Sequence, residues 1–397
     1  MIALFGNGKT TKAIAKRFKD CLIFDDHIKE KSKDEYGNLL LPPNEFSNYE
    51  SDVQVLSPSF PPRHELVKNA KNLMSEYDFF ASQMPFSIWI SGTNGKTTTT
   101  QMCDFLLKDK GSLSGGNIGT PLAELDTNAP IWVLETSSYM LHYTKIATPD
   151  IYLLLPIKPD HLTWHGGFEG YENAKLTPLE RMREGSVVII PKAYKNINTL
   201  AHKIIYNDEF DLSIKLGIDI EKVKFQTPFL LDAILAMAAQ KVLFNKIDYE
   251  KINAFKTDVH KLEEFYDKKG RIWVNDSKGT NLDATLEAVK RYQDANLILI
   301  LGGDDKGVDL SPLFEMLRPL NVQIFAIGSN TEKIVDFCEK INKTVYASYH
   351  LEKAVKEINK IHTLETIVLL SPAAASLDQF KSYEHRGDLF KKLAKEI

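Results

Sequence analysis

Two short glycine-rich stretches of this chain carry the residue types that hold phosphate groups. GNGKTT occupies residues 6–11, and GTNGKTTTT occupies residues 92–100. In such loops the backbone N–H groups can point toward an anion, and the N-terminus of a following helix adds partial positive charge. Lysine supplies a full positive charge, and a threonine hydroxyl is a ligand for Mg²⁺. The sequence therefore predicts two phosphate-binding loops.

The second loop follows an apolar run, SIWIS, and a helical pattern resumes from Thr97. This order of strand, loop and helix predicts an ATP loop, with Lys96 on the β- and γ-phosphates and Thr97 on Mg²⁺. The expected ATP-binding residues here are Gly92, Thr93, Asn94, Gly95, Lys96, Thr97 and Thr98. The strict pattern GxxxxGK[ST] places glycine where this chain has Ile90, so a tight turn before a helix is the alternative.

The first loop also lies between a strand pattern and a helix pattern, and the next apolar run ends at Asp25 and Asp26. Such an arrangement suits a dinucleotide-type fold, with a diphosphate over the helix start and a carboxylate for a ribose or base. The pattern GxGxxG is incomplete because Thr11 occupies the third glycine position, which weakens a dehydrogenase interpretation. A purely structural turn is the alternative.

The elements that must position these loops are short aliphatic runs separated by helical stretches. Several runs, including IWVLE, IYLLL and LILIL, are apolar on both faces, as strands covered by helices must be. The alternation predicts α/β layers with parallel sheets. At 397 residues we expect three domains: a Rossmann-like domain at 1–85, a central P-loop ATPase-type domain at 86–257, and a Rossmann-like domain at 258–397.

Composition narrows the class of partner. The net charge of −4 and the lack of a long Lys/Arg block argue against nucleic acid, and no apolar run approaches a membrane span. Cys21, Cys103 and Cys338 lack metal-site or redox-pair spacing, which predicts buried thiols in a reducing compartment. We therefore expect a cytoplasmic protein that acts on small molecules. A monomer is a separate expectation, which composition does not establish.

Six further motifs follow in order: GGNIGTPL (115–122), ETSSY (135–139), DHLTWHGGFEGYENAK (160–175), NDSKGTN (275–281), LGGDDKG (301–307) and SPAAASLDQFKSYEHRG (371–387). Together with the second loop they resemble the Mur ligases, which join amino acids to the muramoyl precursor of bacterial cell walls. The last three motifs are most similar to those of members that add D-glutamate to UDP-N-acetylmuramoyl-L-alanine. The resemblance implies an ATP-dependent amide ligase that forms an acyl phosphate during peptidoglycan precursor synthesis.

The resemblance also implies a set of catalytic residues: Lys96, Glu135, His161, Lys175 and Lys278. It implies two Mg²⁺ sites, with Thr97, Glu135, His161 and Lys175 as ligands and Lys175 carrying a carbamate formed from CO₂. The ordinary alternatives are a helix-capping carboxylate for Glu135, a structural histidine for His161 and a surface lysine for Lys175.

By the same resemblance, the first loop holds the UDP group of the substrate and the second holds ATP. The implied UDP-substrate residues are Lys9, Thr10, Asp25, Asp26, Ser57, Asn117 and Ser137. Asp232 and Asp276 are added to the ATP residues, on the adenine and ribose sides. D-Glutamate is assigned to Lys278, Thr280, Lys306, Ser376, Leu377 and Tyr383.

Four positions depart from the family pattern. Ser59 replaces a glycine, Lys261 an arginine, Asp232 an asparagine and Met140 a glutamine. Lysine cannot make the bidentate phosphate contact that arginine makes, so the sequence does not decide whether Lys261 contacts a phosphate. Other Mur ligases or a folylpolyglutamate synthase are alternatives, although the DNPR motif of the diaminopimelate-adding relative is absent. A non-catalytic protein that binds UDP-sugar or ATP is the alternative from another class.

Overall fold

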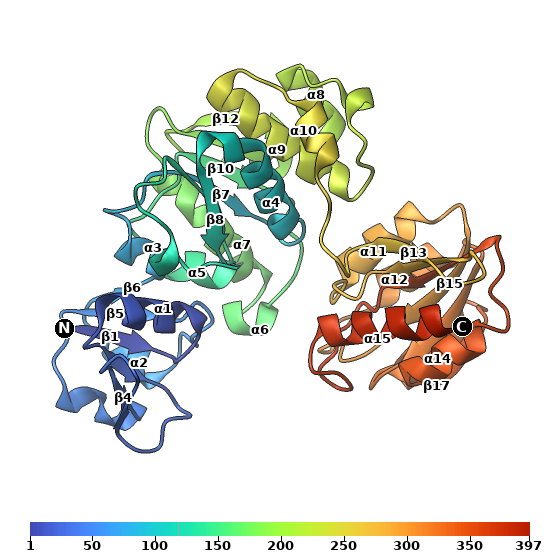
Figure 1. Ribbon diagram of the computed structural model, residues 1–397, viewed down its shortest axis with the longest axis horizontal. Coiled ribbons are helices and arrows are strands. Elements are labelled where there is room, and N and C mark those ends of the chain that lie inside the picture. The colour runs from blue at the N-terminus through green and yellow to red at the C-terminus, as the bar shows by residue number, and fades with distance from the viewer. Residues whose placement is uncertain (118) are drawn as a thin grey trace. The chain divides into compact units, whose positions relative to one another are not determined.

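The computed structural model describes residues 1–117 and 119–397 (Figure 1). The chain divides into two compact units, Met1–Phe255 and Lys256–Ile397. The first unit holds two six-stranded sheets and the second unit holds one. Most strand pairs are parallel and helices connect successive strands, so the predicted α/β class with three sheets is confirmed. Within the described residues, no helix has both the length and the apolar character needed to cross a bilayer.

The first sheet has the strand order β3-β4-β2-β1-β5-β6, and only its β3–β4 pair is antiparallel among the described pairs. Its strands are β1 (Ile2–Phe5), β2 (Leu22–Phe24), β3 (Ser32–Lys33), β4 (Leu39–Leu41), β5 (Val53–Leu56) and β6 (Leu73–Met74). The accompanying helices are α1 (Lys9–Phe18), the 3-10 helix η1 (Pro43–Asn48), α2 (Glu65–Asn69) and α3 (Glu76–Phe79). The first glycine-rich loop thus connects β1 to α1.

The second sheet is parallel throughout, in the order β12-β11-β10-β7-β9-β8. Its strands are β7 (Phe86–Ser91), β8 (Ser112–Gly116), β9 (Ile131–Glu135), β10 (Ile151–Leu154), β11 (Val187–Pro191) and β12 (His202–Tyr206). Its α-helices are α4 (Lys96–Leu107), α5 (Ser138–Tyr143), α6 (Leu162–His165), α7 (Phe168–Arg181), α8 (Glu209–Leu216), α9 (Phe229–Phe244) and α10 (Tyr249–Ala254). Its 3-10 helices are η2 (Lys108–Lys110), η3 (Leu122–Glu124), η4 (Lys192–Tyr194) and η5 (Ile220–Lys222). The longest of these helices is α9, which spans the apolar stretch at residues 230–244.

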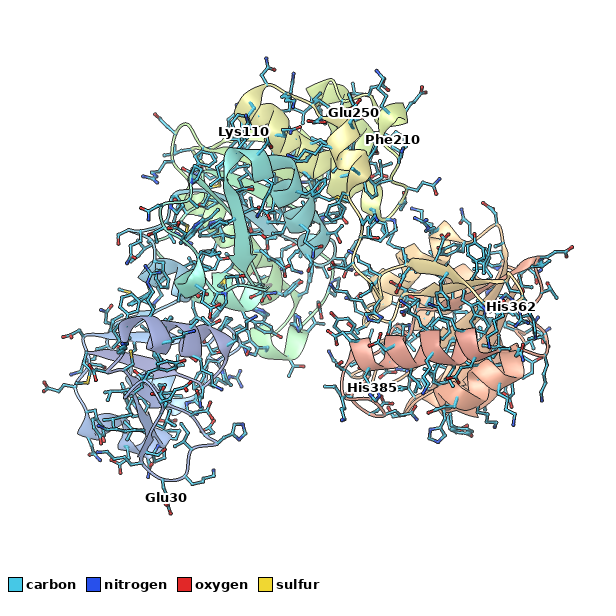
Figure 2. The ribbon with its side chains drawn as sticks, viewed as in Figure 1. Glu30, Lys110, Phe210, Glu250, His362 and His385 are labelled. Carbon is cyan, nitrogen blue, oxygen red and sulfur yellow. The ribbon has the colours of Figure 1, made fainter. Side chains whose placement is uncertain are left out.

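The third sheet forms the second unit, in the order β13-β14-β18-β15-β16-β17, with an antiparallel β13–β14 pair. Its strands are β13 (Glu263–Tyr266), β14 (Ile272–Asn275), β15 (Asn296–Leu301), β16 (Val322–Ile327), β17 (Val345–Tyr349) and β18 (Thr366–Leu370). Its helices are α11 (Leu282–Arg291), α12 (Ser311–Leu317), α13 (Thr331–Lys340), α14 (Leu351–Ile358) and α15 (Tyr383–Glu396). Figure 2 shows the side chains over the whole ribbon, including outward-pointing groups such as Phe210 of α8.

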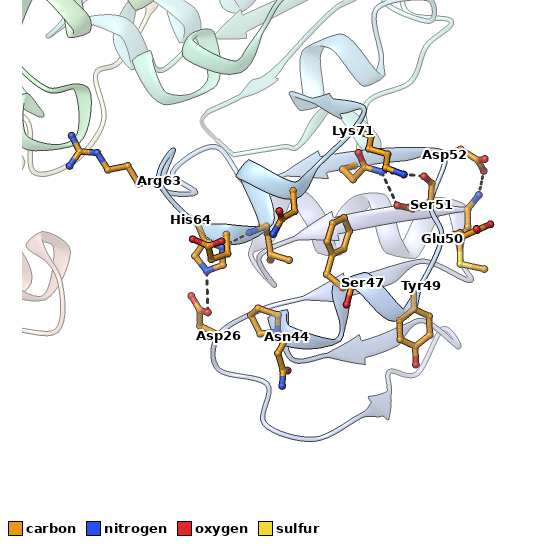
Figure 3. A pocket seen from close by; sticks show the side chains of 17 residues that line it. Asp26, Asn44, Ser47, Tyr49, Glu50, Ser51, Asp52, Arg63, His64 and Lys71 are labelled. Atoms are coloured by element: carbon orange, nitrogen blue, oxygen red, sulfur yellow. Dashed lines mark hydrogen bonds and ion pairs between the residues drawn. The ribbon is translucent and has the colours of Figure 1, made fainter.

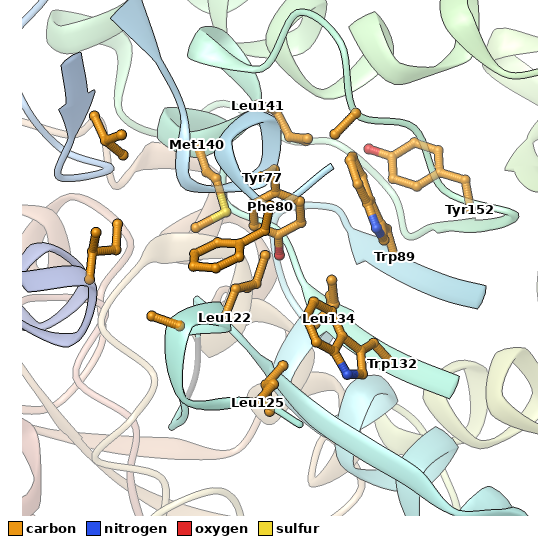
Figure 4. Packing of buried hydrophobic residues seen from close by; sticks show 14 of the residues in the cluster. Tyr77, Phe80, Trp89, Leu122, Leu125, Trp132, Leu134, Met140, Leu141 and Tyr152 are labelled. Atoms are coloured by element: carbon orange, nitrogen blue, oxygen red, sulfur yellow. The ribbon is translucent and has the colours of Figure 1, made fainter. Parts of the chain in front are cut away.

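One apolar core lies under both sheets of the first unit. It contains residues of the first sheet, such as Leu4 and Val55, and residues of the second, such as Trp89 and Trp132. Tyr77, from α3, packs its ring edge-on against Trp89 at a centroid distance of 4.7 Å (Figure 4). This continuity explains why the two sheets form one compact unit. The division at residues 85 and 86 stays a prediction.

Candidate active site

The second glycine-rich loop connects β7 to α4 and needs glycine at two positions. Gly92 has φ +136° and Gly95 has φ +85°, and a Cβ atom at Gly95 would collide with the carboxylate of Asp232. Ile90 is fully buried within β7, where it pairs with Glu135 of β9. The glycine demanded by the strict pattern is therefore not needed at position 90, because the strand continues through it.

The order of the second sheet gathers four loops at one edge. β7 lies between β10 and β9, and β8 lies beyond β9. The ends of these strands are in register, since Glu135 pairs with both Ile90 and Gly116. Ligands of parallel sheets bind at such carboxyl ends, where the loops converge. This edge brings Thr97, Asn117 and Glu135 together.

Glu135 is the centre of a polar group at this edge. It is buried, with 2% exposure. Its Oε2 accepts a hydrogen bond of 2.8 Å from the Thr97 hydroxyl, and its Oε1 accepts one of 2.7 Å from Asn117 Nδ2. Adjacent ligands of an octahedral Mg²⁺ lie about 3 Å apart, because each is about 2.1 Å from the ion. The two oxygens of Thr97 and Glu135 therefore fit one such ion.

Lys96 and Asp232 both contact the loop between β7 and α4 or the first turn of α4. Lys96 Nζ donates a 2.7 Å hydrogen bond to the carbonyl oxygen of Thr93. Asp232 is buried on α9 and its Oδ1 accepts a 3.0 Å bond from the Thr99 hydroxyl. Its carboxylate thus supports the loop from behind Gly95. A contact of Asp232 with adenine stays a prediction.

Lys175 lies in the interior of the first unit. It is 1% exposed on α7, its Nζ donates a 2.7 Å hydrogen bond to the carbonyl of Gly92, and it lies 4.7 Å from the Tyr171 ring centroid. The alternative of a surface lysine is therefore wrong. Burial lowers the pKa of its amine well below the usual value, and the positive charge of Lys96 lowers it further. Burial is the larger of these two causes.

His161 follows β10 with φ +50° and remains partly exposed. Its Nδ1 is 2.7 Å from the hydroxyl of Tyr139, and its Nε2 is 3.4 Å from Asp160 Oδ2. Within residues 1–117 and 119–397, no three His, Cys, Asp or Glu side chains are grouped so as to hold a metal ion. The side chains of His161 and Lys175 both come from the segment between β10 and β11. Their joint role as metal ligands stays a prediction.

The first glycine-rich loop is closed by its threonine. The Thr11 hydroxyl lies 2.7 Å from the carbonyl oxygen of Gly6 and 3.2 Å from that of Gly8. This hydroxyl therefore provides a hydrogen-bond donor to backbone carbonyls of the loop, at the position where the dinucleotide pattern has glycine. Asp25 accepts bonds of 2.7 and 2.8 Å from the backbone N–H groups of Asn7 and His27. These bonds hold the ends of β1 and β2 side by side.

The remaining residues assigned to UDP lie around this loop and at the edge of the second sheet. Ser57 contacts the loop, since its Oγ would be 3.3 Å from a Cβ at Gly8. Lys9 reaches the carbonyl of Gly119, in the same loop as Asn117. Ser137 caps α5 by accepting a bond from Met140 N. Thr10 lies in the first turn of α1.

An open cavity of about 1480 Å³ lies beside the first sheet, between η1 and α2 (Figure 3). Of the residues assigned to UDP, its lining includes Asp26, whose carboxylate lies 3.2 Å from His64 Nε2. Arg63 and Lys71 add positive charge to the same lining. None of residues 6–11 lines this cavity, so it does not enclose the first loop.

In the second unit, Asp276 is directed inward. It is 4% exposed, and its carboxylate accepts bonds from the Ser371 hydroxyl at 2.6 Å and from Leu262 N at 3.2 Å. Burial raises its pKa to about 7. Asp276 thus braces the loop that carries Lys278, whose Nζ is 3.8 Å from Asp258 Oδ2 and 6.0 Å from the Tyr383 ring centroid. A contact with the ATP ribose stays a prediction.

The residues assigned to D-glutamate come from three loops of the second unit. Lys278 and Tyr383 are near each other, and Thr280 donates its backbone N–H to the Lys278 carbonyl. Lys306 has φ +52° in the loop after β15, Ser376 is buried and Leu377 is 72% exposed. The bridge between Asp304 and Ala375 joins the loops of Lys306 and Ser376.

Arg386 has a structural role that sequence reasoning did not assign. It is fully buried and donates bonds to Ser277 Oγ at 2.9 Å, to the Ser277 carbonyl at 2.8 Å and to the Ala374 carbonyl at 3.3 Å. It therefore ties the loop of Lys278 to the loop of Ser376. Its position in the C-terminal motif of residues 371–387 indicated that Arg386 lies near the site. The sequence does not show whether an arginine is buried or exposed.

The departures from the family pattern have local explanations in two cases. Ser59 does not have positive φ, so its backbone needs no glycine. Met140 is buried among apolar groups that include Phe80 and Leu141, where its thioether fits better than an amide (Figure 4). The positive charge of Lys261 lowers the pKa of Asp276 against the larger effect of burial. Its phosphate contact stays open.

The fold and the loop between β7 and α4 define a nucleotide-binding α/β protein with a P-loop type site. The model of the Mur ligase middle domain matches residues 90–233. The chain is 54% identical over 400 residues to the UDP-N-acetylmuramoylalanine–D-glutamate ligase of Campylobacter jejuni, with 100% of both chains covered. It is 46% identical over 415 residues to the ligase of the same name from Helicobacter pylori, with 98% of both covered.

Among solved structures, the chain is similar in fold to the MurF ligase of Thermotoga maritima in complex with ADP. The TM-score is 0.61 at 16% identity, and the match covers 89% of this chain and 90% of that one. The full-length identity to the two relatives settles the family. The chain belongs to the Mur ligases, in the group that the Campylobacter and Helicobacter enzymes represent.

Proposed function

We infer that this chain is an acid–amino-acid ligase that joins D-glutamate to UDP-N-acetylmuramoyl-L-alanine and converts ATP to ADP and phosphate. The single observation that carries this conclusion is the 54% identity to a ligase of that name over the full length of both chains. The reaction belongs to the cytoplasmic synthesis of peptidoglycan precursors. The partners are small molecules, and the protein acts as a monomer without nucleic acid or membrane.

The reaction has two steps. An oxygen of the muramoyl-L-alanine carboxylate attacks the γ-phosphorus of ATP, and ADP leaves. The amine nitrogen of D-glutamate then attacks the acyl carbon, the acyl–oxygen bond breaks, and phosphate and the amine proton leave. Both steps bring anions together, so positioning and charge neutralisation are the main tasks of the protein.

The loop after β7 performs the positioning of ATP. The backbone of residues 92–95 and the N-terminus of α4 surround the phosphates. Lys96 turns its amine from the Thr93 carbonyl to the β- and γ-phosphates. The 2.8 Å pair of oxygens from Thr97 and Glu135 supports this loop as the holder of the first Mg²⁺. When bound, Mg²⁺ withdraws negative charge from the phosphates during transfer.

We assign a second Mg²⁺ to His161 and to a carbamate on Lys175. The neutral amine attacks CO₂ and loses one proton, which gives an anion with one remaining N–H. That N–H can keep the bond to the Gly92 carbonyl, and the positive charge of Lys96 favours the anion over an ammonium. Burial of Lys175 supports the modification because it increases the fraction of neutral amine.

The two glycine-rich loops serve different nucleotides. The loop after β1, with Asp25 and Ser57 beside it, holds the UDP group, while the loop after β7 holds ATP. The bond between Lys9 and Gly119 supports a shared role for the first loop and the loop of Asn117 in seating the UDP-muramoyl substrate. In the second unit, the loops of Lys278, Lys306 and Ser376 hold the two carboxylates of D-glutamate.

The test is phosphate release with UDP-N-acetylmuramoyl-L-alanine and a panel of amino acids. D-Glutamate should give turnover, while L-glutamate, L-alanine and diaminopimelate should give little, because two carboxylates held by fixed donors define handedness. Comparable turnover with L-glutamate would contradict the assignment. Turnover with diaminopimelate in place of D-glutamate would indicate another Mur ligase activity.

A further inference from the structure

Two aromatic side chains of the second sheet's helices hold a turn of the first sheet. The hydroxyl of Tyr143, at the end of α5, donates a buried 2.8 Å hydrogen bond to the carbonyl oxygen of Phe60. The indole Nε1 of Trp164, on α6, donates a 3.3 Å bond to the carbonyl oxygen of Ser59. Both acceptors belong to the turn of residues 57–60 that follows β5.

This turn packs directly on the first glycine-rich loop. Ser57 N donates to the Phe5 carbonyl at 2.8 Å, and the turn closes through a 3.0 Å bond from Phe60 N to the Ser57 carbonyl. A Cβ at Gly6 would lie 3.1 Å from the Ser57 Cβ and 3.5 Å from the Phe60 ring. A displacement of the turn would therefore displace the loop that begins at Gly6.

The same two side chains belong to an aromatic group that extends to His161. Trp164 contacts Tyr143 edge-on at a centroid distance of 6.0 Å and Tyr139 at 4.8 Å. Tyr139 in turn lies 2.7 Å from His161 Nδ1 through its hydroxyl. Close-packed rings transmit displacement because they leave no space to absorb it. The turn and His161 are thus connected by side chains in contact.

We propose that Tyr143 and Trp164 are positioning residues for the UDP-muramoyl substrate. By holding the Ser59 and Phe60 carbonyls, they fix the position of the first glycine-rich loop relative to the edge of the second sheet that carries Thr97 and Glu135. The carboxylate at the far end of the substrate then reaches the ATP loop. This role rests on the proposed function, in which the first loop holds UDP. Neither side chain touches ATP or the reacting atoms.

The test compares the wild-type protein with the double variant Tyr143→Phe/Trp164→Phe, which removes both donors and keeps aromatic rings. Tyr206→Phe is the matched control, because its buried hydroxyl also donates to a backbone carbonyl, that of Leu154, at 2.7 Å. Hydrogen exchange is measured first, without any ligand. Exchange at residues 6–11 and 57–60 should be faster in the double variant and unchanged in the control.

Calorimetry with UDP-N-acetylmuramoyl-L-alanine and, separately, with an ATP analogue follows. The substrate Kd of the double variant should rise roughly five-fold or more, the factor expected when the displaced loop loses one hydrogen bond to the substrate, while the analogue Kd stays constant. Unchanged exchange at residues 6–11 and 57–60 would overturn the proposal. An equal loss of both affinities would also overturn it. Failure of the wild-type protein to bind the UDP substrate would instead contradict the proposed function. The exchange result would still decide whether Tyr143 and Trp164 hold the turn of residues 57–60.

Discussion

The amine of Lys175 lies 2.7 Å from the carbonyl oxygen of Gly92, the first glycine of the loop between β7 and α4. A lysine from α7 thereby contacts the backbone of the phosphate-binding loop. Few lysines are buried without a carboxylate in hydrogen-bond contact, because removing an ammonium from water is costly. The arrangement favours a chemical form of Lys175 that is not an ammonium.

Substitution of Lys175 tests this form. Lys175→Ala and Lys175→Arg should each lose most acyl-phosphate formation, whereas Lys175→Glu should keep some, since it restores an anion. The measurement is ADP release with the UDP substrate, together with a ¹³C carbamate signal after exposure to ¹³CO₂. Lys215→Arg, on the surface of α8, is the control. Full activity of Lys175→Arg would refute the carbamate.

Two effects require glycine at position 95: its positive φ and the lack of space for a Cβ atom. A second glycine with positive φ but free space separates them. Gly95→Ala should abolish binding of an ATP analogue, because the added Cβ meets the Asp232 carboxylate and displaces the loop. Gly185→Ala is the matched control, since Gly185 has φ +86° and nothing within 4 Å. Both variants should lose about 1 kcal/mol of stability from positive φ, but only Gly95→Ala should lose the analogue. Equal analogue affinity in the two variants would contradict this account.

The division of labour between the loops predicts opposite effects at Lys96 and Asp25. Lys96→Ala should abolish phosphoryl transfer and leave binding of the UDP substrate nearly intact. Asp25→Ala removes the acceptor for Asn7 N and His27 N. It should therefore weaken binding of the UDP substrate by about ten-fold and leave ATP binding unchanged. Titration calorimetry with each ligand measures both. If the two variants lose ATP binding equally, the division is wrong.

Glu76 gives a pH dependence of stability that is independent of catalysis. Its carboxylate is buried, accepts a 2.8 Å bond from Leu122 N, and has its pKa raised to about 7 by burial. Between the usual value near 4.5 and 7, the folded state holds a proton that the unfolded state releases, so this group destabilises the fold as pH rises.

The substitution Glu76→Gln should therefore change little at pH 4.5 and stabilise the protein relative to wild type at pH 8. Urea unfolding of the two proteins at both pH values measures the difference. Asp126→Asn, at a site in a surface turn, is the control. A constant difference between Glu76→Gln and wild type across this range would show that the carboxyl does not titrate on folding.

The sequence was sufficient to predict the elements that carry the loops, because strand and helix patterns around residues 86–107 are local. The family motifs predicted Thr97 and Glu135 as Mg²⁺ ligands and Asn117 as a contact of the UDP substrate, and the structure brings all three residues to one sheet edge. The sequence did not predict the burial of Lys175 or the inward direction of Asp276. Both depend on packing between segments far apart in the chain, which local patterns do not encode.

The role of Thr11 shows the same limit at short range. Its mismatch to the dinucleotide pattern was visible, but the bonds of its hydroxyl to the Gly6 and Gly8 carbonyls depend on how the loop closes. Arg386 is a longer-range case, since its partners, Ser277 and Ala374, lie in two other loops. Residues that support a site from beneath are therefore harder to predict than residues that face the ligand.

The apolar core shared by the first two sheets also determines where this gene can be divided for expression. A fragment that ends at residue 85 would keep Tyr77 and Phe80 but lose Trp89, which packs against Tyr77, and other members of the same core. The exposed rings would then drive aggregation in the expression host. A fragment that ends at Phe255 retains the complete core and both glycine-rich loops. Recombinant work on UDP and ATP recognition should therefore start from the longer fragment.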